Sequence, residues 1–166
     1  MSEPPSFITV GDVTVRRAGP ADAAALGAMR AAQRREMHGG EESEFRRFEA
    51  ECAAFFAREL AAGEPWLFGW IAHAGATPAG SSVLMIYPTL PRLGSRGSVD
   101  GRVRDVYVAP EYRRRGLGRA LTLCVVDEAR RRGVDRLALG ASAMGRPLYE
   151  SLGFVAKDDE MIFVPR

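Results

Sequence analysis

Lysine, histidine, cysteine and long apolar runs are all scarce in this sequence of 166 residues. Lys157 is the only lysine among 23 basic residues, and no apolar run approaches the ~18 residues that a membrane-spanning helix requires. The histidines, His38 and His73, have no neighbour at metal-ligand spacing, so we expect no metal. Cys52 and Cys124 lie far apart without a local partner, which excludes a disulfide scaffold and favours two buried free thiols.

The composition is that of one folded domain. Hydrophobic residues make up 46% of the chain and charged residues 27%, which excludes a disordered or collagen-like chain. The length suits a single domain over residues 1–166, with 1–10 as a loosely ordered tail. The first ten residues lack the basic and apolar regions of an export signal, so we expect a cytoplasmic protein without a membrane partner.

Hydrophobic periodicity predicts alternating strands and helices. The predicted strands are 13–16, 66–72, 79–87, 103–108, 134–139, 154–156 and 161–164; the predicted helices are 21–37, 41–60, 117–129 and 145–152. The segment 88–101, rich in glycine, proline and serine, is predicted to be a surface loop. This order of elements implies a mixed α/β sheet with helices on its faces.

Positive charge is concentrated in one part of the chain. Nine arginines and four acidic residues lie between Arg102 and Arg132, so that stretch carries +5 and the remainder −3. Guanidinium groups suit phosphates because they donate several hydrogen bonds in a fixed fork. The block therefore indicates a phosphate-bearing ligand, either a nucleotide-like cofactor or nucleic acid.

The segment Val106 to Arg119 carries the strongest functional signal. A predicted strand runs through a tight turn into the start of a helix, where unpaired amides and the helix dipole favour anions. Gly116 and Gly118 have no Cβ, so a phosphate can approach the backbone closely. The turn is therefore predicted to bind a pyrophosphate.

Three other phosphate sites fit the segment less well. A dinucleotide fingerprint requires glycine or alanine where Leu121 stands, and a P-loop requires a Gly-Lys-Ser/Thr run that a chain with one lysine lacks here. A nucleic-acid patch would use the triplets 113–115 and 130–132. The second triplet ends a helix, where cations are favourable in any case, so nucleic acid is the weakest alternative.

Three blocks of sequence resemble the GNAT superfamily of acyl-CoA-dependent N-acetyltransferases. Residues 113–118 (Arg-Arg-Arg-Gly-Leu-Gly) match its Gln/Arg-x-x-Gly-x-Gly/Ala signature, residues 17–22 look like its first strand-to-helix junction, and residues 148–154 look like its Leu-Tyr-x-x-x-Gly-Phe block. Their spacing fits over nearly the whole chain. The resemblance implies a mixed, mostly antiparallel sheet of six to seven strands with about four helices on its faces, splayed between the family's strands 4 and 5.

The resemblance also implies a cofactor site for acetyl-CoA. The amides from Arg114 to Arg119 would hold the pyrophosphate, and the cofactor strand would pair with the pantetheine arm. The family often has asparagine where this chain has Ser142. The implied cofactor-binding residues are Val106, Tyr107, Val108, Arg113, Arg114, Arg115, Gly116, Leu117, Gly118, Arg119 and Ser142.

Catalytic roles follow from the same resemblance. Tyr149 matches the family's general acid, which protonates the leaving thiolate, and otherwise is a packing residue. Asp105 is assigned from its own chemistry: a carboxylate just before the cofactor strand can accept a proton, so it is a base or a substrate contact, or else an ion-pair partner of Arg104 or Arg102. A serine hydrolase centred on Ser142 is rejected, because the second glycine of the elbow comes one residue late and no histidine follows.

The function implied is transfer of an acetyl group from acetyl-CoA to an amine in a ternary complex. The alternatives are a non-catalytic acyl-CoA-binding sensor and a nucleic-acid-binding module. The acceptor is a small-molecule amine or a peptide N-terminus, and the chain is a monomer or a homodimer. The acceptor's walls are expected from 37–48, the 88–101 loop and the hairpin near Lys157.

Overall fold

The computed structural model describes residues 7–95, 97–157 and 163–165. The strands are β1 (Phe7–Val10), β2 (Val13–Arg17), β3 (Leu67–Ala74), β4 (Thr77–Pro88), β5 (Val99–Val108) and β6 (Arg136–Ala138). The α-helices are α1 (Ala23–His38), α2 (Glu42–Leu60), α3 (Leu117–Arg131) and α4 (Arg146–Ser151), and the short 3-10 helices are η1 (Pro20–Asp22) and η2 (Pro110–Tyr112). The mixed α/β class and the four expected helices are confirmed.

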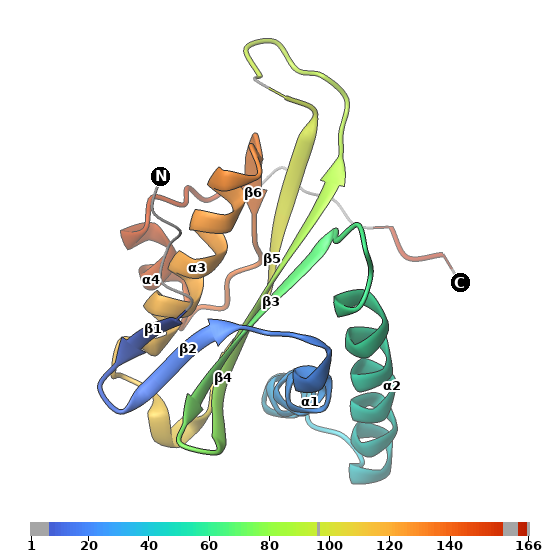
Figure 1. The fold of residues 1–166 in the computed structure, drawn as a ribbon, viewed down its shortest axis with the longest axis vertical. Helices are drawn as coiled ribbons and strands as arrows, with labels where there is room; N and C mark the ends of the chain where they lie inside the picture. The colour runs from blue at the N-terminus through green and yellow to red at the C-terminus, as the bar shows by residue number, and fades with distance from the viewer. Residues whose placement is uncertain (1–6, 96, 158–162, 166) are drawn as a thin grey trace.

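The six strands form one sheet in chain order, β1 to β6. Neighbouring strands are antiparallel from β1 to β5, and β6 alone runs parallel to β5. The mostly antiparallel sheet expected from the sequence is therefore confirmed. The β4–β5 hairpin extends well beyond the rest of the sheet (Figure 1).

Two strand predictions need correction. Residues Phe7–Val10 form β1 rather than part of a loose tail, because the two-residue turn at Gly11 and Asp12 folds them back so that Val10 pairs with Val13. Residues 154–156 are not a strand. The Phe154 amide donates to the Tyr149 carbonyl at 3.0 Å, so this segment closes the turn after α4. Most of the predicted strand 161–164 lies outside the described residues.

Helices cover both faces of the sheet, giving two separate cores (Figure 1). On one face α3 places Leu117, Leu121 and Val125 against apolar residues of β2 to β5. On the other face Leu26 of α1 and Phe56 of α2 pack with apolar residues of β3 and β4. The apolar stripes that predicted α2 and α3 thus face the sheet, as amphipathic helices must.

The two helices of the second face lie unusually close together. A Cβ on Gly27 of α1 would stand 2.9 Å from the backbone nitrogen of Ala53 and the carbonyl of Glu49, both on α2. Only glycine fits there, since any side chain would collide with backbone. This contact holds α2 directly against α1. Within the described residues, no helix combines the length and the apolar character needed to cross a membrane.

Candidate active site

The turn between β5 and α3 presents a row of backbone amides. In this described segment, none of the amides from Arg114 to Arg119 donates to a backbone carbonyl outside the helix or to a capping side chain. Arg114 and Gly116 both have positive φ, at 63° and 85°, which turns the chain tightly before α3 begins at Leu117. The free amides lie where the helix dipole adds positive potential, an arrangement that favours an anion.

The two glycines of the turn differ in what surrounds them. Gly116 is the left-handed N-cap of α3, and the nearest atom to an added Cβ would be a Val10 methyl at 4.0 Å. Gly118 lies in the first helical turn, where an added Cβ would stand 3.4 Å from Leu148 Cδ2 and 3.9 Å from Val108 Cγ2. Gly116 is therefore required by backbone conformation, whereas a methyl group at Gly118 would make ordinary contacts with α4 and β5.

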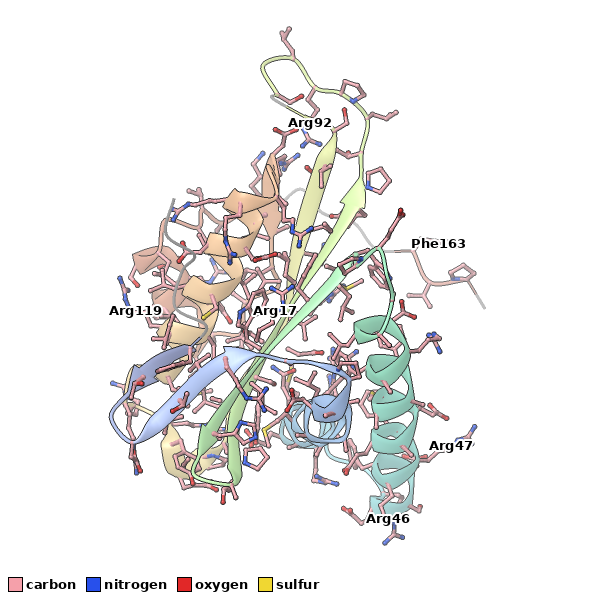
Figure 2. The ribbon with its side chains drawn as sticks, in the orientation of Figure 1. Arg17, Arg46, Arg47, Arg92, Arg119 and Phe163 are labelled. Carbon is pink, nitrogen blue, oxygen red and sulfur yellow. The ribbon has the colours of Figure 1, made fainter. Side chains whose placement is uncertain are left out.

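The arginines of the turn are not equivalent. Arg113 turns back, donating from Nε to the Val108 carbonyl at 2.9 Å and from its terminal nitrogen to Glu36 at 2.6 Å. Arg115 bonds the Glu111 carbonyl, and Arg119, which Figure 2 shows beside α3 and α4, bonds the Ser151 hydroxyl at 3.2 Å. Arg114 is exposed, and no described residue is an ion-pair or hydrogen-bond partner of its guanidinium. Arg114 is thus the turn's most available cation.

Tyr107, expected on the cofactor strand, sends its side chain to α1. Its hydroxyl donates to Glu36 at 2.7 Å, and Glu36 also accepts from Arg113. Burial, reinforced by the bond to Glu36, raises the pKa of Tyr107 to about 12. Burial raises the pKa of Glu36, but the bonds from Tyr107 and Arg113 outweigh it, so the net shift is downward. These three groups fasten the turn to α1.

A bulge distorts β5 just before the turn. Ser81 pairs with Tyr107 and Val83 with Arg104, so Asp105 and Val106 together lie opposite the single residue Ser82. Asp105 has a left-handed φ of 52°. The Val106 carbonyl accepts from the Gln33 side chain at 3.1 Å. Such bulges re-aim side chains and are common beside active sites.

The β5 and β6 strands separate at the same level. Their parallel pairing covers only Asp100, Gly101 and Arg102 of β5. The edge of β5 from Val103 onward therefore has no strand partner on that side among the described residues. The splay that the family resemblance implied is present here, between β5 and β6 in the present labels, and it leaves an edge on which an extended ligand can pair.

Asp105 forms an ion pair with Arg30 of α1, not with the adjacent arginines on its own strand. The bond uses Asp105 Oδ1, and no described residue bonds Oδ2. The Asp105 side chain is 7% exposed. Its carboxylate is thus held in place with one oxygen still available.

Tyr149 lies on α4 next to Leu148, and the Leu148 side chain approaches Gly118 of α3. The Tyr149 ring packs edge-on against Phe154, with centroids 6.0 Å apart, and burial raises the pKa of Tyr149 above its ordinary value. Its hydroxyl makes no hydrogen bond to a described residue. Ser142 lies just before this helix, and its Oγ accepts from the Gly145 amide at 3.1 Å, so the hydroxyl already has a structural bond.

A cavity of about 420 Å³ lies between α1, α2 and the strands β3 to β5. Its lining residues are Arg30, Phe48, Glu51, Cys52, Phe55, Phe56, Leu67, Val83, Met85, Arg104 and Asp105. Of the walls expected for an acceptor, only 37–48 contributes, through Phe48, and part of the hairpin near Lys157 lies outside the described residues. Sequence reasoning missed most of this lining, although the phenylalanine stripe of α2 was visible. No group of three potential metal ligands occurs among the described residues.

Comparison with known proteins agrees with this geometry. The family model described as "Acetyltransferase (GNAT) family" matches residues 28–154. A glucosamine 6-phosphate N-acetyltransferase of Trypanosoma brucei brucei is 39% identical over 82 residues, 49% of this chain and 54% of that protein. The ribosomal protein bS18-alanine N-acetyltransferase of Escherichia coli K12 is 47% identical over 53 residues, 30% of this chain and 36% of that protein. The chain thus spans about half or less of these relatives.

Solved structures share the fold over nearly the whole chain. A GCN5-related N-acetyltransferase from Ralstonia eutropha JMP134 is 26% identical with a TM-score of 0.77, covering 92% of this chain and 98% of that one. A predicted acetyltransferase from Clostridium acetobutylicum, solved with acetyl-CoA, is 22% identical with a TM-score of 0.79, covering 92% and 96%.

Proposed function

The chain belongs to the GNAT family of acetyltransferases, and on that premise we propose that it transfers an acetyl group from acetyl-CoA to an amine in a ternary complex. One observation carries the proposal: the free amides from Arg114 to Arg119 lie at the start of α3, beside the unpaired edge of β5. A pyrophosphate fits the amides, and an extended pantetheine arm fits the edge. The exposed Arg114 adds charge where the phosphates would lie.

Acetyl-CoA supplies an acetyl group as a thioester, which an amine can attack without a covalent enzyme intermediate. The open edge of β5 would hold the acyl group in the gap beside β6. A backbone amide near Val108 would donate to the carbonyl oxygen as negative charge develops there. The Asp105 bulge directs the other side of the strand to the cavity between α1 and α2, from which the amine would arrive.

The proton balance assigns roles to two side chains. A C–N bond forms, the C–S bond breaks, the nitrogen loses one proton and the sulfur gains one. Tyr149 would give its phenolic proton to the sulfur and then take a proton back from water. Burial raises the pKa of this phenol above its ordinary value. Asp105 Oδ2 would accept a hydrogen bond from the amine and pass its proton to water, while Arg30 keeps the carboxylate in position.

Arg113 would act on the cofactor through position rather than charge. Its guanidinium bonds the Val108 carbonyl and Glu36, which draws the turn toward α1. Ser142 would act in a similar way, holding the start of α4 and with it the helix that carries Tyr149.

The test is release of CoA from acetyl-CoA in the presence of a panel of amines, with the acetylated product identified by mass spectrometry. We expect release that depends on an amine and a product heavier by one acetyl group. Calorimetry should detect acetyl-CoA binding without any amine. Tight binding with no turnover of any amine would instead support an acyl-CoA sensor, and failure to bind acetyl-CoA would contradict the proposal altogether.

A further inference from the structure

The cavity between α1 and α2 has an apolar body. Seven of its eleven lining residues are apolar, including the rings of Phe48, Phe55 and Phe56 from one side of α2. A volume of about 420 Å³ is within the range of small-molecule sites. A cavity walled by three phenylalanines favours a ligand with a large apolar or aromatic group over a sugar, whose hydroxyls would lose their hydrogen bonds to water there.

Four charged side chains also line the cavity, and three of them have partners. Arg30 pairs with Asp105, and Glu51 pairs with Arg47 at 2.9 Å. Arg104 has no ion pair or hydrogen bond to any described residue. The uncompensated charge in the cavity wall is therefore positive.

Neighbouring groups also act on Arg104. Burial lowers the pKa of Arg104, and the charges of Arg102, Arg30 and Arg34 lower it further, whereas Asp105 opposes them. An anion placed beside Arg104 would gain a charge-assisted hydrogen bond to its guanidinium. The site favours a ligand with a negative group.

The bulge brings two consecutive residues of opposite charge into the same cavity. In a regular strand Arg104 and Asp105 would point to opposite faces. The left-handed φ of Asp105 breaks that alternation, and both side chains line the cavity. An α-amino acid carries its amine and its carboxylate on one carbon, which matches a carboxylate and a guanidinium from neighbouring positions.

We infer that the acceptor is a free α-amino acid with a large apolar side chain. This inference rests on the proposed acetyltransferase function and names its substrate class. Arg104 binds the carboxylate, Asp105 Oδ2 receives the amine, and the side chain lies among Phe48, Phe55 and Phe56. An N-terminal residue of a peptide lacks the free carboxylate and is a poorer acceptor.

The first experiment compares kcat/KM at saturating acetyl-CoA for L-phenylalanine, L-phenylalaninamide, L-alanine and glucosamine 6-phosphate. L-phenylalanine should exceed its amide about 10- to 100-fold because the amide cannot pair with Arg104. It should exceed L-alanine by a similar factor because alanine leaves the apolar cavity unfilled. Equal rates for acid and amide, or a preference for glucosamine 6-phosphate, would overturn the inference while leaving the acetyltransferase proposal intact.

Arg104→Gln provides the matching variant. It should lower the rate with L-phenylalanine about 10- to 100-fold more than the rate with the amide, so that the preference for the acid disappears. Arg46→Gln is the control, because Arg46 lies outside the cavity lining and points away from the body of the protein at the end of α2 (Figure 2). It should retain the preference. A preference that survives Arg104→Gln would contradict the role of Arg104.

A binding measurement separates this inference from the catalytic proposal. N-acetyl-L-phenylalanine should bind the wild-type protein in calorimetry without any CoA, and Arg104→Gln should weaken that binding about 10-fold or more. If binding depends on Arg104 but no amine is turned over, the substrate class holds and the catalytic proposal fails. If amines are turned over but N-acetyl-L-phenylalanine binds both proteins equally, the substrate class is wrong.

Discussion

Replacing Gly116 with alanine tests the phosphate-binding turn through its backbone conformation. Gly116 has a φ of +85° at the N-cap of α3, and an added Cβ would meet no atom nearer than 4.0 Å. The substitution therefore adds backbone strain without a collision. A left-handed conformation costs a residue other than glycine about 1–2 kcal/mol.

The strain lowers either the free energy of unfolding or the affinity for acetyl-CoA, and the two losses together equal the same energy. If the free turn keeps its shape, the free energy of unfolding falls by about 1–2 kcal/mol, which lowers Tm by roughly 2–8 °C in a domain of this size. If the free turn relaxes, acetyl-CoA must restore the shape, and its affinity falls about 5- to 30-fold. The acetyl-CoA complex loses the same stability in either case.

Gly133→Ala is the matched control, since Gly133 also has a left-handed φ, at +65°, and an added Cβ there would meet no atom within 4 Å. It follows the C-terminal end of α3, at the opposite end of that helix from the phosphate-binding turn. The same strain should lower Tm by a similar amount, whereas acetyl-CoA affinity should change less than about threefold. Thermal unfolding measures Tm with and without acetyl-CoA, and calorimetry measures the affinity of each variant. Wild-type stability of the Gly116→Ala complex, or equal losses of affinity in both variants, would refute the reasoning.

Three further predictions concern other groups. Tyr149→Phe keeps the ring against Phe154 and removes the proton donor, so kcat should fall about 10²–10⁴-fold with little change in acetyl-CoA affinity; wild-type turnover in steady-state assays would leave Tyr149 a packing residue. Acetyl-CoA affinity should weaken as the salt concentration rises. Arg114→Gln should reduce this salt dependence and Arg113→Gln should not, because the Arg113 guanidinium is already bonded to Glu36 and Val108. Binding titrations at several salt concentrations that give the same salt dependence for both variants would contradict this. The hydrogen bond from Arg16 lowers the pKa of Asp22 despite burial. The carboxylate therefore stabilises the fold above its unfolded pKa of ~3.9 and loses that effect as pH falls through its lower folded pKa. Urea unfolding should show Asp22→Asn to be less stable than the wild type at pH 7, with the difference vanishing in acid; a difference that stays constant with pH would exclude the ion pair as its source.

The sequence by itself determined the elements whose signals are local. The apolar stripe from Leu117 to Ala129 predicted α3, and the stripe from Phe45 to Leu60 predicted α2, because helix periodicity is written within a few turns of chain. The strand, turn and glycines from Val106 to Gly118 predicted an anion site for the same reason: the free amides belong to one continuous segment. The short closing strand at 154–156 was predicted wrongly, since a short apolar run does not reveal whether a neighbouring strand exists to pair with it.

Only the tertiary structure decided how distant side chains combine. The alternative to a catalytic role for Asp105 was an ion pair with Arg104 or Arg102 on its own strand, but its ion-pair partner is Arg30, 75 positions earlier in the chain. Arg113 was predicted to be a cofactor-binding residue, and only the structure shows that its guanidinium bonds Glu36, 77 positions earlier. Both outcomes depend on the close packing of α1 against α2 and β5. The cavity, in which Arg104 has no partner among the described residues, depends on the bulge that turns Asp105 toward it. Local sequence specifies which conformations a segment prefers. Which charged groups and aromatic rings come into contact across a core depends on the packing of all the elements, and therefore on the whole chain.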